Sequence, residues 1–160
     1  MGHGFWVVGL VLVLAAACTG GEVICEPAPF ADASSHDDAL ATSDGAIEVW
    51  GLFYPPSFSD LDDAPVQIEM PQPGDEGLTK VVWRATGEGP FVAEASGPDD
   101  VSIEPTGVVE HLGSNWDRPG DEWGTTWNFP QPGCWTFTIT RGDDTAQISI
   151  EVLPAGQVAS

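Results

Sequence analysis

The chain has 160 residues, of which 25 are acidic and four basic, giving a formal net charge of −21 at pH 7. So acidic a surface repels nucleic acid and anionic lipid headgroups, which excludes nucleic-acid binding and leaves a covalent lipid as the means of any membrane attachment. The length corresponds to one domain with a sizeable core, and Gly and Pro are spread along the chain as turn residues.

The N-terminal segment predicts export. Residues 5–17 are apolar or small and carry no charge. This run is too short for a membrane-spanning helix of roughly 20 residues, but it suits the core of a signal peptide. Small residues then precede Cys18, and a Thr-Gly-Gly stretch follows it.

This arrangement resembles the lipobox of bacterial lipoproteins. The resemblance implies a signal peptide over residues 1–17, a diacylglyceryl thioether on Cys18, and cleavage that leaves Cys18 as the mature N-terminus. The protein would then be extracytoplasmic and attached to the cell membrane by its N-terminal lipid alone. The alternative is conventional cleavage after Ala-Ala-Ala at residues 15–17.

The two other cysteines, Cys25 and Cys134, would remain in an oxidising compartment. An even pair there is most simply a disulfide. The bond would close a loop of about 110 residues and contribute roughly 4–5 kcal/mol on the chain-entropy model. A metal-binding pair is the alternative, but the three histidines show no zinc-ligand spacing with the cysteines. We therefore expect no metal and no cofactor.

Residues 18–45 are polar, small and acidic. This composition predicts a flexible linker that lifts the domain off the membrane, with Cys25 holding part of it down.

From residue 46 onward, short apolar runs alternate with turns rich in Gly and Pro. We expect strands at residues 46–53, 66–70, 78–85, 91–95, 101–104, 107–112, 124–129, 134–140 and 146–152. Many short strands without helices between them predict a β-sandwich or barrel over residues 46–154, followed by a short tail at 155–160.

The last predicted hairpin has the clearest pattern. In residues 134–140 the apolar side chains of Trp135, Phe137 and Ile139 alternate with small or polar ones, so one face of the strand points to the core. The Pro-Gly-x-aromatic sequence that enters this strand resembles the corner before the penultimate strand of many immunoglobulin-like sandwiches. Trp135 would then pack under the turn. The predicted fold is an all-β, immunoglobulin-like β-sandwich.

Three short motifs carry a more specific resemblance: VWGL at 49–52, KVVWR at 80–84, and the segment 113–135 that ends in FPQPGCW. Together they resemble a group of bacterial lipoproteins that share an FPxPGCW entry into a C-terminal hairpin. The resemblance covers most of residues 46–153. It implies the sandwich fold, the lipid anchor and the Cys25–Cys134 bond, and it implies no activity.

The most unusual stretch for chemistry is residues 113–124, rich in Gly and charged side chains. Its candidate ligand-binding residues are Trp116, Asp117, Arg118, Asp121, Glu122 and Trp123. Exposed indole rings here, or at Trp127, would bind sugar rings or cations, and the carboxylates would bind hydroxyl groups or Ca²⁺. The alternative is an ordered surface loop in which Arg118 pairs with a neighbouring carboxylate and the indoles pack on the sandwich.

The sequence contains no G-x-S-x-G, P-loop, dinucleotide-binding or H-E-x-x-H motif. We therefore predict no catalytic residue and no enzyme. The favoured hypothesis is an interaction or scaffold module that binds an extracytoplasmic protein. The second is a domain that binds a glycan or Ca²⁺ through residues 113–124, and an enzyme is the least favoured.

Overall fold

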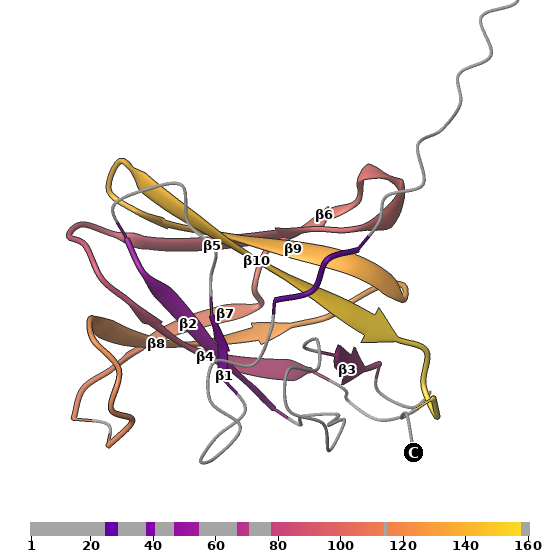
Figure 1. Cartoon of the computed structure of the whole chain (residues 1–160), viewed down its shortest axis with the longest axis horizontal. Coiled ribbons are helices and arrows are strands. Elements are labelled where there is room, and N and C mark those ends of the chain that lie inside the picture. Colours follow the sequence, from indigo (N-terminus) through magenta and orange to yellow (C-terminus); the bar gives the residue numbers. More distant parts are fainter. Residues whose placement is uncertain are drawn as a thin grey trace, which may run out of the picture.

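A computed structural model describes residues 25–28, 38–40, 47–54, 67–70, 78–113 and 115–157, with the backbone alone described for 38–40 (Figure 1). Within these ranges the chain forms ten strands and one short 3₁₀ helix. They are β1 (Asp38–Leu40), β2 (Val49–Tyr54), β3 (Gln67–Glu69), β4 (Thr79–Ala85), β5 (Phe91–Ser96), η1 (Pro98–Asp100), β6 (Ser102–Ile103), β7 (Gly107–His111), β8 (Asp121–Trp127), β9 (Gly133–Arg141) and β10 (Asp144–Leu153). None of the described residues belongs to a helix long and apolar enough to cross a bilayer.

The strands form two sheets that stack face to face (Figure 1). One has the order β1-β2-β4-β8-β7, and the other has the order β3-β10-β9-β5-β6. Strands β2, β4, β8 and β7 follow the A-B-E-D order of an immunoglobulin sheet, and β5, β9 and β10 follow the C-F-G order of its partner. Strand β3 pairs in parallel with β10. The predicted all-β, immunoglobulin-like sandwich is confirmed.

Each of the nine predicted runs overlaps an observed strand, and the structure differs from the prediction in two places. Strand β8 begins at Asp121, so three residues assigned to the loop before it belong to the sheet instead. They pair in register with the end of β4, with Glu122 opposite Arg84. The second difference is β1, a strand inside the predicted linker, whose Ala39 lies opposite Gly51 of β2.

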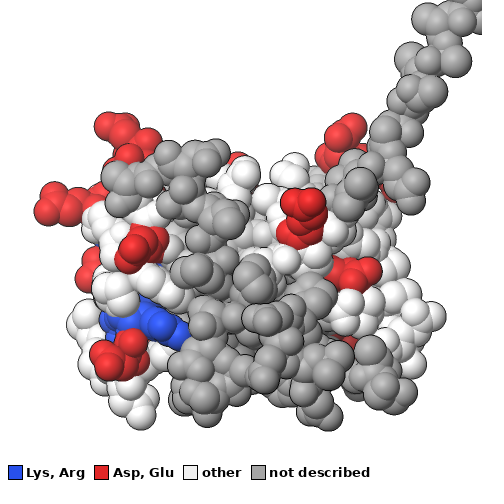
Figure 2. Space-filling view, viewed as in Figure 1, with Lys and Arg blue, Asp and Glu red and all other residues white. Residues whose placement is uncertain are grey.

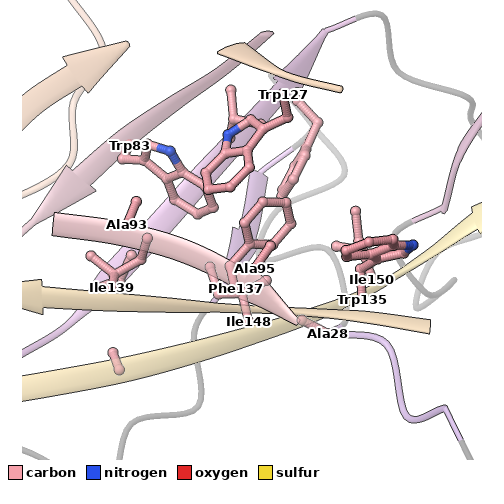
Figure 3. Packing of buried hydrophobic residues seen from close by; sticks show 14 of the residues in the cluster. Ala28, Trp83, Ala93, Ala95, Trp127, Trp135, Phe137, Ile139, Ile148 and Ile150 are labelled. Atoms are coloured by element: carbon pink, nitrogen blue, oxygen red, sulfur yellow. The ribbon is translucent and has the colours of Figure 1, made fainter. Parts of the chain in front are cut away.

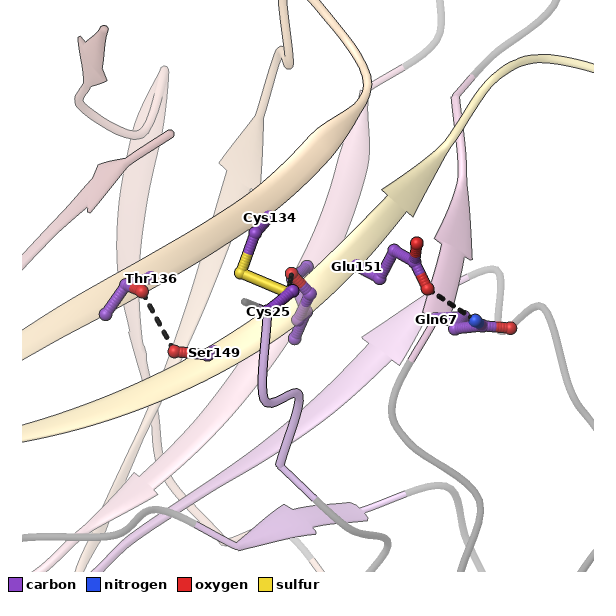
Figure 4. Close-up of a disulfide and its surroundings, with 7 residues drawn as sticks. Cys25, Gln67, Cys134, Thr136, Ser149 and Glu151 are labelled. Atoms are coloured by element: carbon purple, nitrogen blue, oxygen red, sulfur yellow. Dashed lines mark hydrogen bonds between the residues drawn. A yellow bond between two sulfur atoms is a disulfide. The ribbon is translucent and has the colours of Figure 1, made fainter. Parts of the chain in front are cut away.

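The start of the domain is also fixed to the sandwich. Cys25 and Cys134 form the predicted disulfide, with their Cα atoms 5.4 Å apart (Figure 4). The backbone N–H of Ala28 donates to the carbonyl of Ser149 at 2.7 Å, and the Ala28 side chain is buried. The predicted linker over 18–45 is therefore interrupted by segments that belong to the domain. Its other residues, the signal peptide at 1–17 and the last three residues of the tail lie outside the described residues.

The core forms where the inner faces of the two sheets meet, and aromatic rings fill its centre (Figure 3). Phe137 lies between two indoles, with its ring centroid 5.2 Å from that of Trp83 and 4.9 Å from that of Trp127, both in edge-to-face geometry. Strand β5 presents only the small side chains of Ala93 and Ala95 to this space. Small residues on one strand thus leave the volume that the indoles of the opposite sheet occupy.

Trp135 is fully buried beside the turn that precedes β9, as the Pro-Gly-x-aromatic pattern predicts. Its indole N–H donates to the carbonyl of Gln131 in that turn at 3.1 Å. The ring lies so close to Gly97 that a Cβ at position 97 would come within 2.5 Å of it. A glycine is therefore required there for steric reasons.

One buried hydroxyl accepts hydrogen bonds from two indoles of the aromatic core. The indole N–H groups of Trp83 and Trp127 each donate to Thr125 Oγ1 at 2.7 Å. The Thr125 hydroxyl in turn donates to the backbone carbonyl of Val81 at 3.2 Å. The two indole N–H groups would otherwise be unpaired in an apolar interior, where each unpaired group costs stability.

Candidate functional site

The candidate segment 113–124 divides into a loop and a strand. Gly113 and residues 115–120 form the described part of the loop, Ser114 lies outside the described residues, and β8 begins at Asp121. Gly120 joins the two with a φ of +91°. A side chain at this position would overlap the carbonyl of Ala85, so only glycine lets the chain pass so close to the end of β4.

Glu122 lies at the centre of a row of polar side chains that crosses three strands. The strand registers place Arg84 of β4 on one side of it and His111 of β7 on the other. Glu122 is only 5% exposed. Arg84 Nε donates to its Oε2 at 3.1 Å, and His111 Nδ1 lies 3.1 Å from its Oε1. The carboxylate thus receives a hydrogen bond on each oxygen, which offsets the cost of burying its charge.

Arg84 also holds the loop. Its Nη1 donates to the carbonyl of Gly120 at 2.7 Å, and its Nη2 donates to the carbonyl of Trp116 at 3.0 Å. Each of the three guanidinium nitrogens of Arg84 thus donates to a group of β8 or of the loop before it. Arg84 therefore connects Glu122 to the backbone of residues 115–120.

A buried arginine holds the start of β8 from the opposite sheet. Arg141 is 4% exposed, and its Nη2 lies 3.1 Å from Asp121 Oδ2. Its Nε donates to the carbonyl of Gly89 at 3.0 Å, and its guanidinium carbon lies 4.3 Å from the centroid of the Trp123 ring. Trp123 also stacks on Phe91, with the planes 10° apart. Trp123 is therefore a core residue at this end of the sandwich.

The six candidate ligand residues are thus separated by the structure. Asp121, Glu122 and Trp123 lie in β8 and are bound to groups of other strands, whereas Trp116, Asp117 and Arg118 remain on the loop. Asp117 is exposed, and the other two are half-buried. Trp123 and Trp127 are buried and present no ring face to a sugar. Among the described residues, no three His, Cys, Asp or Glu side chains are grouped so that they could hold a metal ion.

Sequence reasoning missed Arg84, His111 and Arg141 as partners of this segment. The sequence predicted the adjacent Arg118 as the cation that pairs with these carboxylates. The cations that contact Glu122 and Asp121 are instead Arg84 of β4 and Arg141 of β9. One signal was present, because Trp123, Thr125 and Trp127 alternate with the period of a strand.

No protein-family model matches this chain, and no curated protein matches its sequence.

The arrangement fixes the loop in place, and a single substitution tests this role. Glu122→Gln removes the buried negative charge that Arg84 and His111 contact. We expect the free energy of unfolding to fall by about 1.5–3 kcal/mol, because hydrogen bonds to a charged group are the stronger kind. Amide hydrogens of residues 115–120 should also exchange faster. Urea denaturation and hydrogen exchange measure these two effects.

Glu110→Gln is the matched control, because Glu110 is an exposed carboxylate on the neighbouring strand β7. It should change stability by less than about 0.5 kcal/mol. Equal effects of the two substitutions would contradict a role for Glu122 in holding the loop.

Proposed function

We propose that this chain is an exported lipoprotein whose immunoglobulin-like sandwich acts as an interaction module on the outer side of the cell membrane. The partner would be another extracytoplasmic protein. The proposal is supported by the lipobox-like sequence around Cys18 and, above all, by a run of exposed apolar side chains on an otherwise acidic domain.

The exposed apolar side chains are concentrated in one segment. Six large apolar residues are exposed in the described part of the chain, and three of them fall between residues 108 and 112. Val108 is 47% exposed, Val109 60% and Leu112 90%. Scattered apolar residues are normal on a protein surface, whereas neighbouring ones are typical of a binding surface. On the face drawn in Figure 2, by contrast, acidic side chains are spread widely and the basic ones form one small patch.

The disulfide determines how far the domain would stand from a lipid on Cys18. Cys25 is bonded to Cys134, so only seven residue steps separate the lipid from a fixed point of the sandwich. A fully extended chain of that length spans about 25 Å. The domain would be held close to the membrane, and the long linker that the composition of 18–45 predicts would not set its height.

The same bond would orient the sandwich. Cys134 lies at the start of β9, and Arg141 ends that strand about 24 Å further along. The turn at 142–143 follows Arg141, and the register places Phe91 of β5 opposite it. The end of the sandwich that carries the turn at 142–143, the start of β5 and the 115–120 loop would face away from the membrane.

Cys18→Ser tests the anchor. A diacylglyceryl group supplies two acyl chains, which is enough for stable membrane attachment. The variant should therefore move from the membrane fraction to the soluble fraction or the medium, as judged by immunoblotting of fractionated cells. Cys25→Ser is the control, and it should stay with the membrane. A Cys18→Ser protein that sediments with membranes as the natural chain does would contradict the proposal.

A further inference from the structure

We infer that the outer edge of β7 is a docking edge to which an extended, basic segment of a partner protein adds as a further strand. The inference rests on the proposed interaction function and names the surface and the partner chemistry for it. In this mode the main chain of the partner supplies hydrogen bonds to the sheet, and its alternate side chains supply specificity.

Strand β7 is the longest of the four strands that end the two sheets in the described part of the chain. The two sheets end in β1 and β7 and in β3 and β6, respectively. Strands β1 and β3 have three residues and β6 has two, whereas β7 has five. Short edge strands, Lys and Pro are the usual protections against unwanted pairing. Strand β7 contains neither Lys nor Pro, and its exposed Glu110 would repel an acidic strand but attract a basic one. No strand in the described part of the chain pairs with its outer side, so its outer backbone groups can serve as a template.

The side chains of β7 suit an added strand. Val108 lies opposite Thr125 and Val109 opposite Gly124, so the two valines point to opposite faces of the sheet. Both are exposed, and no further strand in the described part of the chain pairs with β7 on its outer side. A partner strand that pairs with β7 would also have side chains on both faces of the sheet. Those on one face would cover Val108, and those on the other face would cover Val109. Leu112, which follows the strand, would extend the apolar contact.

The charge of this side of the sandwich selects the partner. Strands β6 and β7 are the outer strands of the two sheets and are joined by residues 104–106. The segment 97–111 that contains them carries no Lys or Arg and one histidine, His111, which contacts Glu122. It has four exposed carboxylates: Asp99, Asp100, Glu104 and Glu110. A cationic segment is attracted to this side, whereas a second copy, with its own net charge of −21, is repelled.

A model peptide can test the edge directly. The probe is a fluorescent ten-residue peptide of alternating Val and Lys, titrated into the detergent-solubilised full chain and followed by anisotropy. Val109→Lys places a protective charge on the edge, and we expect it to weaken binding at least tenfold. Val92→Lys is the matched control, because Val92 is also exposed but lies on β5, in the other sheet. It should weaken binding less than twofold. Bound peptide should slow amide exchange at residues 107–111.

Three results would overturn the inference. Equal weakening by the two lysine variants would show diffuse charge attraction without a docking edge. Equal binding of a Val-Glu peptide would exclude a requirement for a basic partner. A full chain that is dimeric, and that Val109→Lys makes monomeric, would assign the edge to a second copy. The Cys18→Ser fractionation does not depend on β7, so failure of the docking edge is distinguishable from failure of the proposed function.

Discussion

Replacing Thr125 by Val is expected to lower the free energy of unfolding by about 2–5 kcal/mol, although the two side chains have nearly the same shape. The substitution leaves the indole N–H groups of Trp83 and Trp127 without an acceptor, and the carbonyl of Val81 without the hydroxyl. Each buried polar group left unpaired costs about 1–3 kcal/mol. Urea denaturation followed by tryptophan fluorescence measures the loss.

Two control variants distinguish the loss of the hydrogen bonds from other effects of replacing a threonine side chain. Thr125→Ser keeps the hydroxyl and removes one methyl group, so it should cost only about 1 kcal/mol. Thr126→Val makes the same substitution one position along β8, on the opposite face of the sheet, and should change stability by less than about 0.5 kcal/mol. If Thr125→Val and Thr126→Val were equally stable, the shared acceptor would not stabilise the core.

Removal of the Cys25–Cys134 bond is expected to have a comparable effect. The bond joins residues 109 apart in the sequence, and its loss releases the conformational entropy of a long loop in the unfolded chain. Loss of a native disulfide from a small exported domain typically costs about 2–5 kcal/mol. We expect Cys25→Ser to lower the free energy of unfolding by this amount in denaturant titrations.

Comparing the stabilities of the single and double cysteine variants tests whether the effect comes from the shared bond. Cys134→Ser and the double variant should each be destabilised as much as Cys25→Ser, because all three lack the same bond. A reducing agent should lower the stability of the natural chain and leave that of the double variant unchanged. Additive losses from the two single variants would show that the cysteines contribute separately and that no common bond stabilises the domain.

The sequence was most informative where one strand has one buried face. The alternation in residues 134–140 and 146–152 determines which side chains of β9 and β10 enter the core, because the period of two fixes the face of each residue. The turn residues between the runs mark the strand ends. The count of cysteines led to the disulfide because the lipobox-like motif accounts for Cys18.

Strand β1 was missed because the sequence around Asp38 is polar and has no strand pattern of its own. Its three residues are in a strand because the edge of β2 is available to pair with them. Such pairing is a property of the assembled sheet and does not depend on local side chains. The same reason explains why a composition typical of linkers concealed the contact of Ala28 with the domain, whereas the contact at Cys25 was predicted from the cysteine count.

The candidate site could be located but not interpreted from the sequence. The concentration of charge and tryptophan at 113–124 does mark a distinctive end of the sandwich. Its charged partners come from strands far away in the chain, with Arg84 38 residues from Glu122 and Arg141 20 residues from Asp121. Only the registers of β4, β7 and β8 bring Arg84, Glu122 and His111 into one row.

The intact mass of the unreduced protein extracted from membranes tests the central claim most directly, because it reports the anchor and the disulfide together. The account predicts a chain that begins at Cys18, carries the added mass of a diacylglyceryl group, and is two hydrogens lighter than the reduced form. A chain that retains residues 1–17, or one cleaved before Cys18 without lipid, would contradict a lipid-anchored interaction module.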